Sequence, residues 1–177
     1  MITAQVAPSD IPVLQQVSFY VTKKEEKIVE EFAPEPYTTA TLLQDAIILY
    51  GWSSSQVMQV AQWLFENGLI TYPRTDSISV APEASDEARK ITVLLFGKES
   101  LNSKKRWGQM ENHAIGAHEA IRPASSARMP HQLSVEVGED ERRLYALIWK
   151  RFIAWYMIPA KFRIITVDLE TDEDPGQ

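Results

Sequence analysis

Apolar residues recur at helical spacing through most of the chain, while β-forming residues gather near its two ends. Thr38 or Thr39 can cap a first helix that Gly51 closes, and Ser53 opens a second helix that stops at Asn67. Two helices joined by so short a turn predict a helix-turn-helix unit, although this pattern is common among proteins.

Two more helices are predicted further along the chain. One can begin after Pro82 and carries apolar residues at helical spacing before Gly97. The other follows the acidic residues 139–141, which favour a helix N-terminus, and its apolar positions continue to Trp155. Between these helices, residues 97–117 predict a long loop.

The segments 13–22 and 162–169 are rich in β-formers and predict one strand near each end of the chain. The first leads into the charged residues 23–27, which predict a turn. Since neither strand has a partner next to it in sequence, either the two pair with each other around the helical segment, or both belong to a sheet that is largely missing. We therefore expect the chain to be a piece of a larger protein.

Composition narrows the class of protein. With 45% apolar residues among 177, the chain can bury a core as one domain, or as one domain and part of a second. It contains no cysteine, which excludes a disulfide framework, a thiolate zinc site and a cysteine nucleophile. No apolar run approaches the roughly 20 residues of a membrane span, and no secretory signal pattern opens the sequence, so we expect a cytoplasmic protein without a membrane partner.

The net charge of −6 argues against nucleic acid as a partner, but the charge is unevenly distributed. Residues 98–128 carry six basic and three acidic residues, whereas the segments on either side are net acidic. We expect any contact with a polyanion in this segment; the alternative is a solvated lysine loop.

The sequence Ile-Thr-Tyr-Pro-Arg-Thr-Asp-Ser at residues 70–77 places a possible nucleophile, Tyr72, beside a cation, Arg74. Pro73 ends the β-like segment before it, so Tyr72 is expected at a strand end. The phenol of a tyrosine has a pKa of about 10, so attack on phosphorus requires a nearby cation or proton acceptor. The alternative is a core-packed tyrosine followed by a surface ion pair of Arg74 and Asp76.

A second cluster, Gly-Ala-His-Glu-Ala-Ile-Arg-Pro, occupies residues 116–123. On the short helical turn expected before Pro123, His118 and Arg122 would share a face and could reach one phosphate. Histidine can also donate the proton that a leaving hydroxyl needs. The alternative is a solvent-exposed turn held by a Glu119–Arg122 pair.

Both clusters resemble signatures of the type IA DNA topoisomerases, the first the active-site tyrosine signature and the second the HEAIRP signature. The segment Pro-Tyr-Thr-Thr-Ala-Thr-Leu at 36–42 resembles the one that precedes the family's tyrosine domain. The segment Leu-Tyr-Ala-Leu-Ile-Trp-Lys-Arg-Phe at 144–152 resembles a later helix of the family. The four segments occur in the family's order.

The resemblance implies a mainly α fold with some β structure. Residues 36–128 would form the active-site tyrosine domain, with a winged-helix core like that of catabolite activator proteins. Residues 1–35 and 129–177 would be the two connections to a partial hinge domain. If the partner sheet is absent, apolar residues of the terminal strands are exposed or pair between copies, so self-association is possible. These residues are Val13, Val17, Phe162, Ile164 and Ile165.

The resemblance also implies a reaction and its residues. Tyr72 would attack a phosphodiester of single-stranded DNA, with Arg74 and His118 at the scissile phosphate, and resealing would need no ATP. Glu119 and Arg122 would bind the DNA backbone or orient their neighbours. The remaining members of the signature would support the tyrosine turn; they are Thr75, Asp76 and Ser77.

Several features of the family are missing or altered. The TOPRIM domain, which binds Mg²⁺ in the full enzyme, has no counterpart here, so no metal site is expected in this fragment, which would be inactive alone. Asp172 and Asp174 read as solvated charge, Ala124 stands where the family often has threonine, and Trp155 and Tyr156 favour packing. The alternative interpretation is a non-catalytic winged-helix module that binds DNA. The sequence does not distinguish between the subfamilies of topoisomerase.

Overall fold

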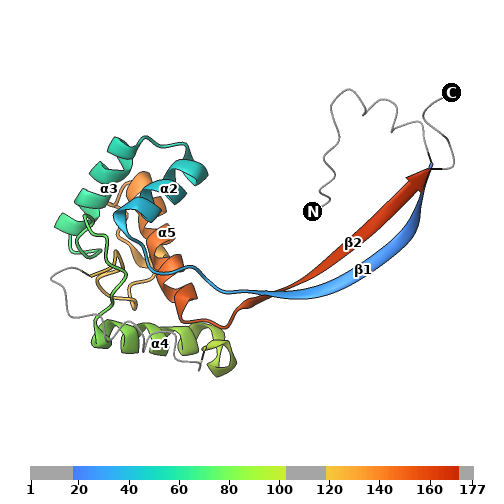
Figure 1. Ribbon diagram of the computed structural model, residues 1–177. Coiled ribbons are helices and arrows are strands. Elements are labelled where there is room, and N and C mark those ends of the chain that lie inside the picture. The colour runs from blue at the N-terminus through green and yellow to red at the C-terminus, as the bar shows by residue number, and fades with distance from the viewer. Residues whose placement is uncertain (1–17, 103–118, 172–177) are drawn as a thin grey trace. The chain divides into compact units, whose positions relative to one another are not determined.

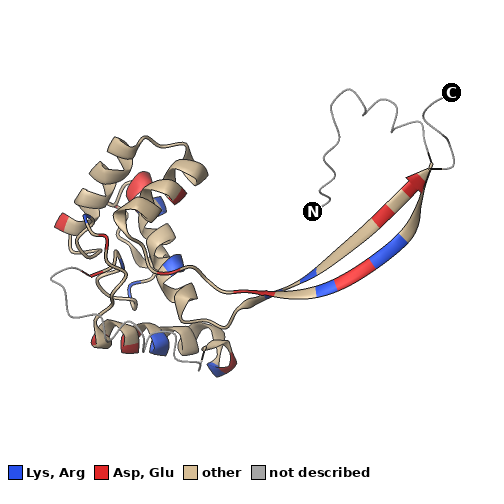
Figure 2. Cartoon of the chain, viewed as in Figure 1, with Lys and Arg blue, Asp and Glu red and all other residues tan. Residues whose placement is uncertain are grey.

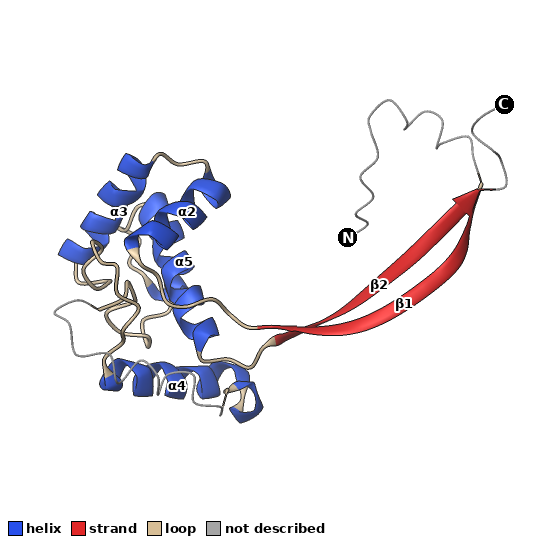
Figure 3. Ribbon diagram, viewed as in Figure 1, coloured by secondary structure: helices blue, strands red, loops and turns tan. Residues whose placement is uncertain are grey.

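The computed structural model describes residues 18–102 and 119–171 of the chain (Figure 1). The chain divides into two compact units, one formed by residues 32–160 and the other by the segments up to Glu31 and from Lys161. Each unit is described by itself. The larger unit is mainly helical, and the smaller one is a two-stranded ribbon (Figure 3).

The predicted helix-turn-helix pair is present as α2 (Thr39–Tyr50) and α3 (Ser54–Glu66). Thr38 caps α2, since its hydroxyl accepts a hydrogen bond from the Thr41 amide and the Thr41 hydroxyl accepts one from the Thr38 amide. Gly51 ends α2 in the left-handed conformation, with a φ of 68° that glycine adopts without strain. The prediction of a short turn between two helices is confirmed.

The other two predicted helices are α4 (Pro82–Phe96) and α5 (Glu139–Trp155). In the described part of the chain they are accompanied by the 3₁₀ turns η1 (Lys98–Ser100) and η3 (Pro130–Gln132). In Figure 1, α5 runs through the middle of the helical unit, and it packs against α3, α4 and η3. The first turn of α5 contains three acidic residues, as a helix N-terminus favours.

One hydrophobic core unites the four helices of this unit. Helix α5 contributes most to it, because seven of its side chains are buried. Trp155 and Tyr156 are both buried, at 4% and 0% exposure, which agrees with the packing role expected of them. Burial on this scale makes α5 the main support of the loops that pass over it.

The smaller unit pairs β1 (Phe19–Glu31) with β2 (Ala160–Thr171). The strands are antiparallel, since Thr22 bonds to Asp168 near one end of the ribbon and Glu30 pairs with Lys161 at the other. The sequence left open whether the two terminal strands pair with each other or belong to a larger sheet; in the structure they pair with each other. Nearly every residue of both strands is exposed.

The expected turn at residues 23–27 is wrong, because β1 continues through this charged run. Residues two apart lie on the same face of a strand, and here they pair as Lys23 with Glu25 and Lys24 with Glu26, at 2.7 and 3.1 Å. Both signs of charge thus lie along β1 (Figure 2), and mutual pairing removes the repulsion that would break a run of like charge.

Candidate active site around Tyr72

The turn that carries Tyr72 begins where α3 ends. Gly68 has a φ of 65°, and the following amide of Leu69 donates to the Leu64 carbonyl, which reverses the chain after the helix. Three residues later the chain reaches Tyr72. Position and direction of the tyrosine turn are therefore set by the C-terminus of α3.

The first residue of α2 fixes the other side of this turn. The Thr39 hydroxyl accepts a hydrogen bond from the Thr75 amide at 2.8 Å and lies 2.7 Å from the Pro73 carbonyl oxygen. The Thr39 amide donates to the Thr75 carbonyl at 2.9 Å. Thr75 is itself buried, so these peptide groups depend on Thr39 for their hydrogen bonds.

The two sequence clusters lie side by side. The Thr71 amide donates to the Arg122 carbonyl at 2.9 Å, and the Arg122 amide donates to the Thr71 hydroxyl at 3.0 Å. Ile70 and Pro123 form an antiparallel bridge next to these bonds. The backbone thus joins the tyrosine signature to the HEAIRP segment, and Ile121 in turn bridges to Tyr37 in front of α2.

The helical turn expected at residues 118–121 is wrong for the part that the structure describes. Residues 119–123 are extended, because their peptide groups bond across to Thr71 and Tyr37 and not to each other. His118 lies outside the described residues, so its position relative to Arg122 stays a prediction.

Arg122 and Glu119 form a close ion pair. The guanidinium donates to one Glu119 carboxylate oxygen through Nε and Nη2, at 3.0 and 2.6 Å, and through Nη1 to the Pro123 carbonyl. The Arg122 side chain is only 12% exposed. Its donors are largely committed within the motif. The ion pair of the alternative interpretation is therefore present, but in an extended and largely buried segment and not on a solvent-exposed turn.

Tyr72 projects its phenol from this braced turn toward solvent, with 44% exposure. Its ring packs edge-to-face on Phe65 of α3, with 5.3 Å between ring centroids. No hydrogen bond from the described residues occupies its hydroxyl. The phenol is therefore held on one side by an aromatic ring and is open to an incoming group on the other.

Three other tyrosines of the helical unit are unsuited to nucleophilic attack. Burial raises the pKa of Tyr145 and of Tyr156 to about 12, and burial together with the adjacent Asp45 raises that of Tyr37 further. Their hydroxyls donate to Arg128, Ser85 and Asp45 respectively. These phenols stay protonated and bonded within the protein.

Arg74 is exposed and lies against α3, where its Nη1 donates to Gln62 at 3.1 Å. It borders a pocket of about 430 Å³ with residues of α3. Asp76, the partner considered in the sequence alternative, makes no ion pair with it within the described structure. The Arg74 guanidinium therefore keeps donors that can contact an anion beside Tyr72.

The remaining members of the tyrosine signature organise the backbone after the turn. The Thr75 hydroxyl accepts from the Ser77 amide at 3.0 Å, and the Ser77 hydroxyl accepts from the Ser79 amide at 3.1 Å. Asp76 is exposed. Within the described ranges, no group of three or more metal-ligating side chains could hold a metal ion. No helix among these ranges is long and apolar enough to cross a bilayer.

Comparison with known proteins gives a consistent result. The profile of the DNA topoisomerase family matches residues 4–175. The chain belongs to this family. It is 36% identical to DNA topoisomerase 1 of Thermotoga maritima over 169 residues, which cover 90% of the chain and 27% of that relative. It is 39% identical to DNA topoisomerase 1 of Helicobacter pylori over 158 residues, which cover 84% of the chain and 22% of that relative.

A solved structure of full-length topoisomerase I from Thermotoga maritima is similar to this one, with a TM-score of 0.72 and 33% sequence identity. The match covers 94% of this chain and 28% of that one. The chain thus spans about a quarter of the length of the topoisomerases that it matches. The mixed fold of helices and paired strands is the one that such a topoisomerase segment adopts.

Four residues that shape the site were missed as site residues by sequence reasoning. Thr39 was assigned only as a possible helix cap, although it belongs to the segment 36–42 that resembles the family. Thr71, Phe65 and Gln62 act through contacts with residues outside their own elements, and their spacing carries no signal of these contacts.

Proposed function

We propose that this chain is the segment of a type IA DNA topoisomerase that carries the nucleophile, and that Tyr72 cleaves and rejoins single-stranded DNA. The observation that carries the proposal is the exposed Tyr72 phenol on a turn braced by both Thr39 and the HEAIRP segment. A catalytic tyrosine must be held in a defined position, whereas a surface tyrosine without a function does not need two distant segments to fix its backbone.

The reaction is a pair of transesterifications. The Tyr72 oxygen attacks phosphorus as its proton passes to solvent water, a Tyr72 O–P bond forms, and the bond from phosphorus to the 3′ oxygen breaks. The leaving 3′ oxygen takes up a proton. After another strand has passed through the gap, the 3′-hydroxyl attacks the phosphotyrosine and releases Tyr72. One phosphodiester replaces another, so this isomerase needs no ATP for the chemical steps.

The neighbouring residues have distinct proposed roles. Arg74 would bind oxygens of the scissile phosphate through the donors that Gln62 leaves free. His118 would contact the same phosphate and protonate the leaving oxygen. The Glu119–Arg122 pair would brace the motif, because Arg122 is already bonded to Glu119 and Pro123.

The proposal extends to the parts of the enzyme beyond this chain. The described residues do not fit Mg²⁺, since they hold no suitable cluster of ligands, and no step here is assigned to it. A magnesium site would belong to a TOPRIM domain, without which the segment would be inactive. Residues 36–128 would form the tyrosine domain, with a winged-helix core, and the segments on either side would connect it to a hinge domain. The parent enzyme would act in the cytoplasm, at the nucleoid.

Self-association is also part of the proposal. The ribbon exposes large apolar side chains on both strands, among them Phe162, Ile164 and Ile165 at 45–48% exposure. An isolated two-stranded ribbon is marginally stable in water, so further pairing or packing would stabilise it. In the parent enzyme this role would fall to the rest of the hinge domain, and in this chain alone to a second copy.

Covalent capture tests the chemistry. The chain is mixed with a 3′-labelled single-stranded oligonucleotide and magnesium, with and without a separately produced TOPRIM domain of a relative, and then denatured. We expect a labelled adduct that needs the added domain and is abolished by Tyr72→Phe. The matched control is Tyr20→Phe, which removes a phenol of nearly equal exposure, 45% against 44%, from the ribbon and should leave the adduct unchanged.

The alternative is a winged-helix module that binds DNA without cleaving it. Its signature would be reversible oligonucleotide binding with no adduct under either condition, in a chain whose fold is intact by circular dichroism. A loss of reversible binding in Tyr72→Phe would instead assign Tyr72 to base stacking. Either result would overturn the catalytic proposal.

A further inference from the structure

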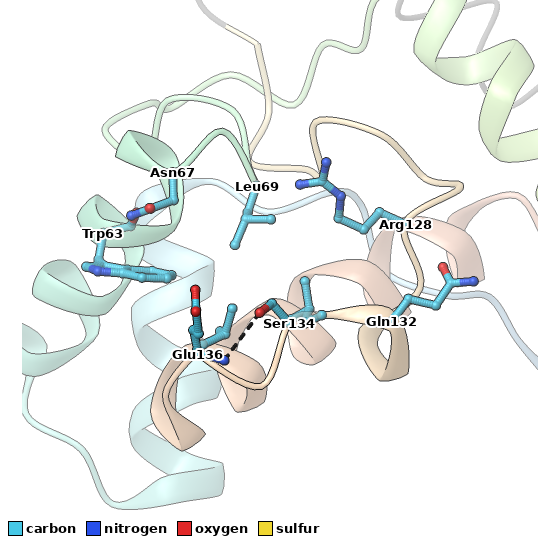
Figure 4. Close-up of a pocket in the computed structure, with 9 residues that line it drawn as sticks. Trp63, Asn67, Leu69, Arg128, Gln132, Ser134 and Glu136 are labelled. Atoms are coloured by element: carbon cyan, nitrogen blue, oxygen red, sulfur yellow. Dashed lines mark hydrogen bonds between the residues drawn. The ribbon is translucent and has the colours of Figure 1, made fainter.

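A second pocket, which shares Trp63 of α3 with the pocket beside Arg74, has no role in the chemistry described so far. Its volume is about 410 Å³, within the range of small-molecule sites. Figure 4 shows Trp63 and Asn67 entering from α3 on one side and Arg128 and Gln132 from the facing loop on the other. Leu69 and Leu133 supply buried apolar surface.

The loop that contributes Arg128 to the pocket wall is held in place by hydrogen bonds from α5 and α4. The Tyr145 hydroxyl of α5 donates to the Arg128 carbonyl at 2.6 Å, and the Trp149 indole donates to the Ser126 carbonyl at 2.9 Å. From α4, Glu87 accepts from the Ser126 amide at 2.6 Å. Because two helices fix the backbone, a ligand would not have to order the wall on binding.

Two opposite charges face this pocket without pairing. Figure 4 shows the Arg128 guanidinium and the Glu136 carboxylate on opposite sides of the hollow. Neither group makes an ion pair or side-chain hydrogen bond with the described residues, although the Glu136 amide donates to the Ser134 hydroxyl. A cation donor and an anion acceptor are thus left for a ligand placed between them.

The chemistry of the lining favours a flat, neutral ring with a polar edge. Trp63 offers an aromatic surface for stacking. Glu136 would repel a phosphate but accepts hydrogen bonds from ring amino groups, as carboxylates do with cytosine N4. Arg128 donates to ring nitrogens and carbonyl oxygens. Nucleobases combine these three properties.

The pocket is close to the proposed nucleophile along a rigid path. Leu69 lines it, and Tyr72 follows three residues later, so their Cα atoms lie within about 11 Å of each other. Helix α3 borders both places through neighbouring residues of its last turns, since Trp63 lines the pocket and Phe65, which leaves the helix in another direction, packs against the Tyr72 ring. A base bound here would belong to the strand that Tyr72 attacks.

We infer that this pocket binds one unpaired base of the DNA strand and thereby sets which phosphate meets Tyr72. The inference rests on the proposed function for its substrate. It assigns Trp63, Arg128 and Glu136 as residues that determine the cleavage position, by stacking on the base and reading its edge.

Binding of oligonucleotides to the full chain tests this inference without any cleavage. The chain carries Tyr72→Phe, and the probes are fluorescent single strands of equal length in which an abasic site is moved one position at a time. We expect the loss of one particular base to raise Kd about tenfold, as loss of one stacked base does. In Trp63→Leu or Glu136→Gln that penalty should fall below about threefold.

The matched control for Arg128→Gln is Arg143→Gln, which removes the same charge from an exposed position of α5. The first should weaken the base penalty and the second should leave it intact. Glu136 and Arg128 are exposed, so their variants keep the fold even if Trp63→Leu does not.

Equal Kd values for intact and abasic strands would overturn the inference, as would a base penalty that persists in all three pocket variants. A second measurement separates this inference from the proposed function: adduct formation by the chain with Tyr72 intact, in the presence of magnesium and the separately produced TOPRIM domain. An adduct without a base penalty removes the pocket role alone. A base penalty without an adduct keeps the pocket and removes the catalytic role.

Discussion

The hydroxyl of Thr39 joins two elements that the sequence separates by more than thirty residues. It accepts from the Thr75 amide and lies beside the Pro73 carbonyl, so the start of α2 and the turn after Tyr72 form one hydrogen-bonded unit. A single side-chain oxygen therefore sets the backbone from which the proposed nucleophile projects.

Thr39→Val keeps the shape of this side chain and removes the oxygen. We expect the free energy of unfolding to fall by about 1–3 kcal/mol, because the part-buried Thr75 amide loses its acceptor. Hydrogen exchange of the Thr75 amide, followed by NMR, should accelerate, and adduct formation by Tyr72 should decrease.

Thr41→Val is the matched control, since it removes a capping hydroxyl from the same first turn without touching the tyrosine turn. It should cost similar stability and leave exchange at Thr75 unchanged. If both variants lowered adduct formation equally, the role of Thr39 would be general helix stability.

The buried tyrosines make the free energy of unfolding depend on pH in the alkaline range. Unfolded tyrosines lose their proton near pH 10, whereas Tyr145 and Tyr156 hold theirs to about 12 in the folded chain. Stability is therefore independent of these groups below pH 10 and falls as the pH rises from 10 to 12, by about 1.4 kcal/mol per unit for each tyrosine.

Urea unfolding at a series of alkaline pH values measures this slope, with tyrosinate absorbance as the second probe. The double variant Tyr145→Phe, Tyr156→Phe should show a shallower decline. A decline that begins well below pH 10 in the original chain would assign it to other groups.

Single residues were predictable from sequence where the chemistry was local. The short signature with Tyr72 and Arg74 could be recognised as a candidate site from its own residues. The extended form of residues 119–123 could not, because it arises from bonds to Thr71 and Tyr37 that no spacing reveals. The ion pair of Glu119 and Arg122 was open as an alternative because it needs only local geometry.

At the scale of elements, α5 organises loops as well as packing the core. Arg142 donates through Nε to the Val137 carbonyl at 2.9 Å and through Nη1 to the Leu133 carbonyl at 3.3 Å. Tyr145 and Trp149 continue this support along the helix. The segment between Ser126 and Val137 is shaped mainly by side chains of the helix that follows it.

Arg142→Ala should therefore release this loop. We expect a loss of about 1.5–3 kcal/mol in the free energy of unfolding, measured in urea, since the carbonyl groups lose charged donors. Arg143→Ala, one residue along, removes an exposed arginine that has a 3.8 Å contact to Glu139 and lies 5.4 Å from the centroid of the Tyr50 ring. It should change stability by less than about 1 kcal/mol. Equal losses in the two variants would contradict the supporting role.

Helices were predictable as elements because their caps are encoded locally. Thr38, Ser53 and Gly51 lie where the structure begins or ends α2 and α3. The length of β1 was not predictable in the same way. Its charged run becomes strand through pairing with β2, whose sequence lies more than a hundred residues away.

For the whole molecule, stability resides in the helical unit. Among the residues that the structure describes, all members of the core lie within 32–160, whereas the ribbon is exposed along both strands. We expect residues 32–160 produced alone to unfold cooperatively at nearly the same midpoint as the full chain, in thermal scans. Light scattering should find this unit monomeric and the full chain concentration-dependent in mass.

A failure of residues 32–160 to fold would mean that the ribbon contributes to the core unit. A full chain that stays monomeric at every concentration would remove the proposed self-association. The two measurements address separate properties, so one can fail while the other holds.

The pairing of β1 with β2 brings the ends of these strands together, as the contact between Glu30 and Lys161 marks. The polypeptide therefore leaves the ribbon and returns to it at neighbouring points. This is the arrangement of an inserted domain, whose two ends lie close together. Such a domain can be inserted, removed or replaced without changing the path of the backbone of the surrounding protein. Engineers could graft the unit into any scaffold that offers two adjacent antiparallel strand ends.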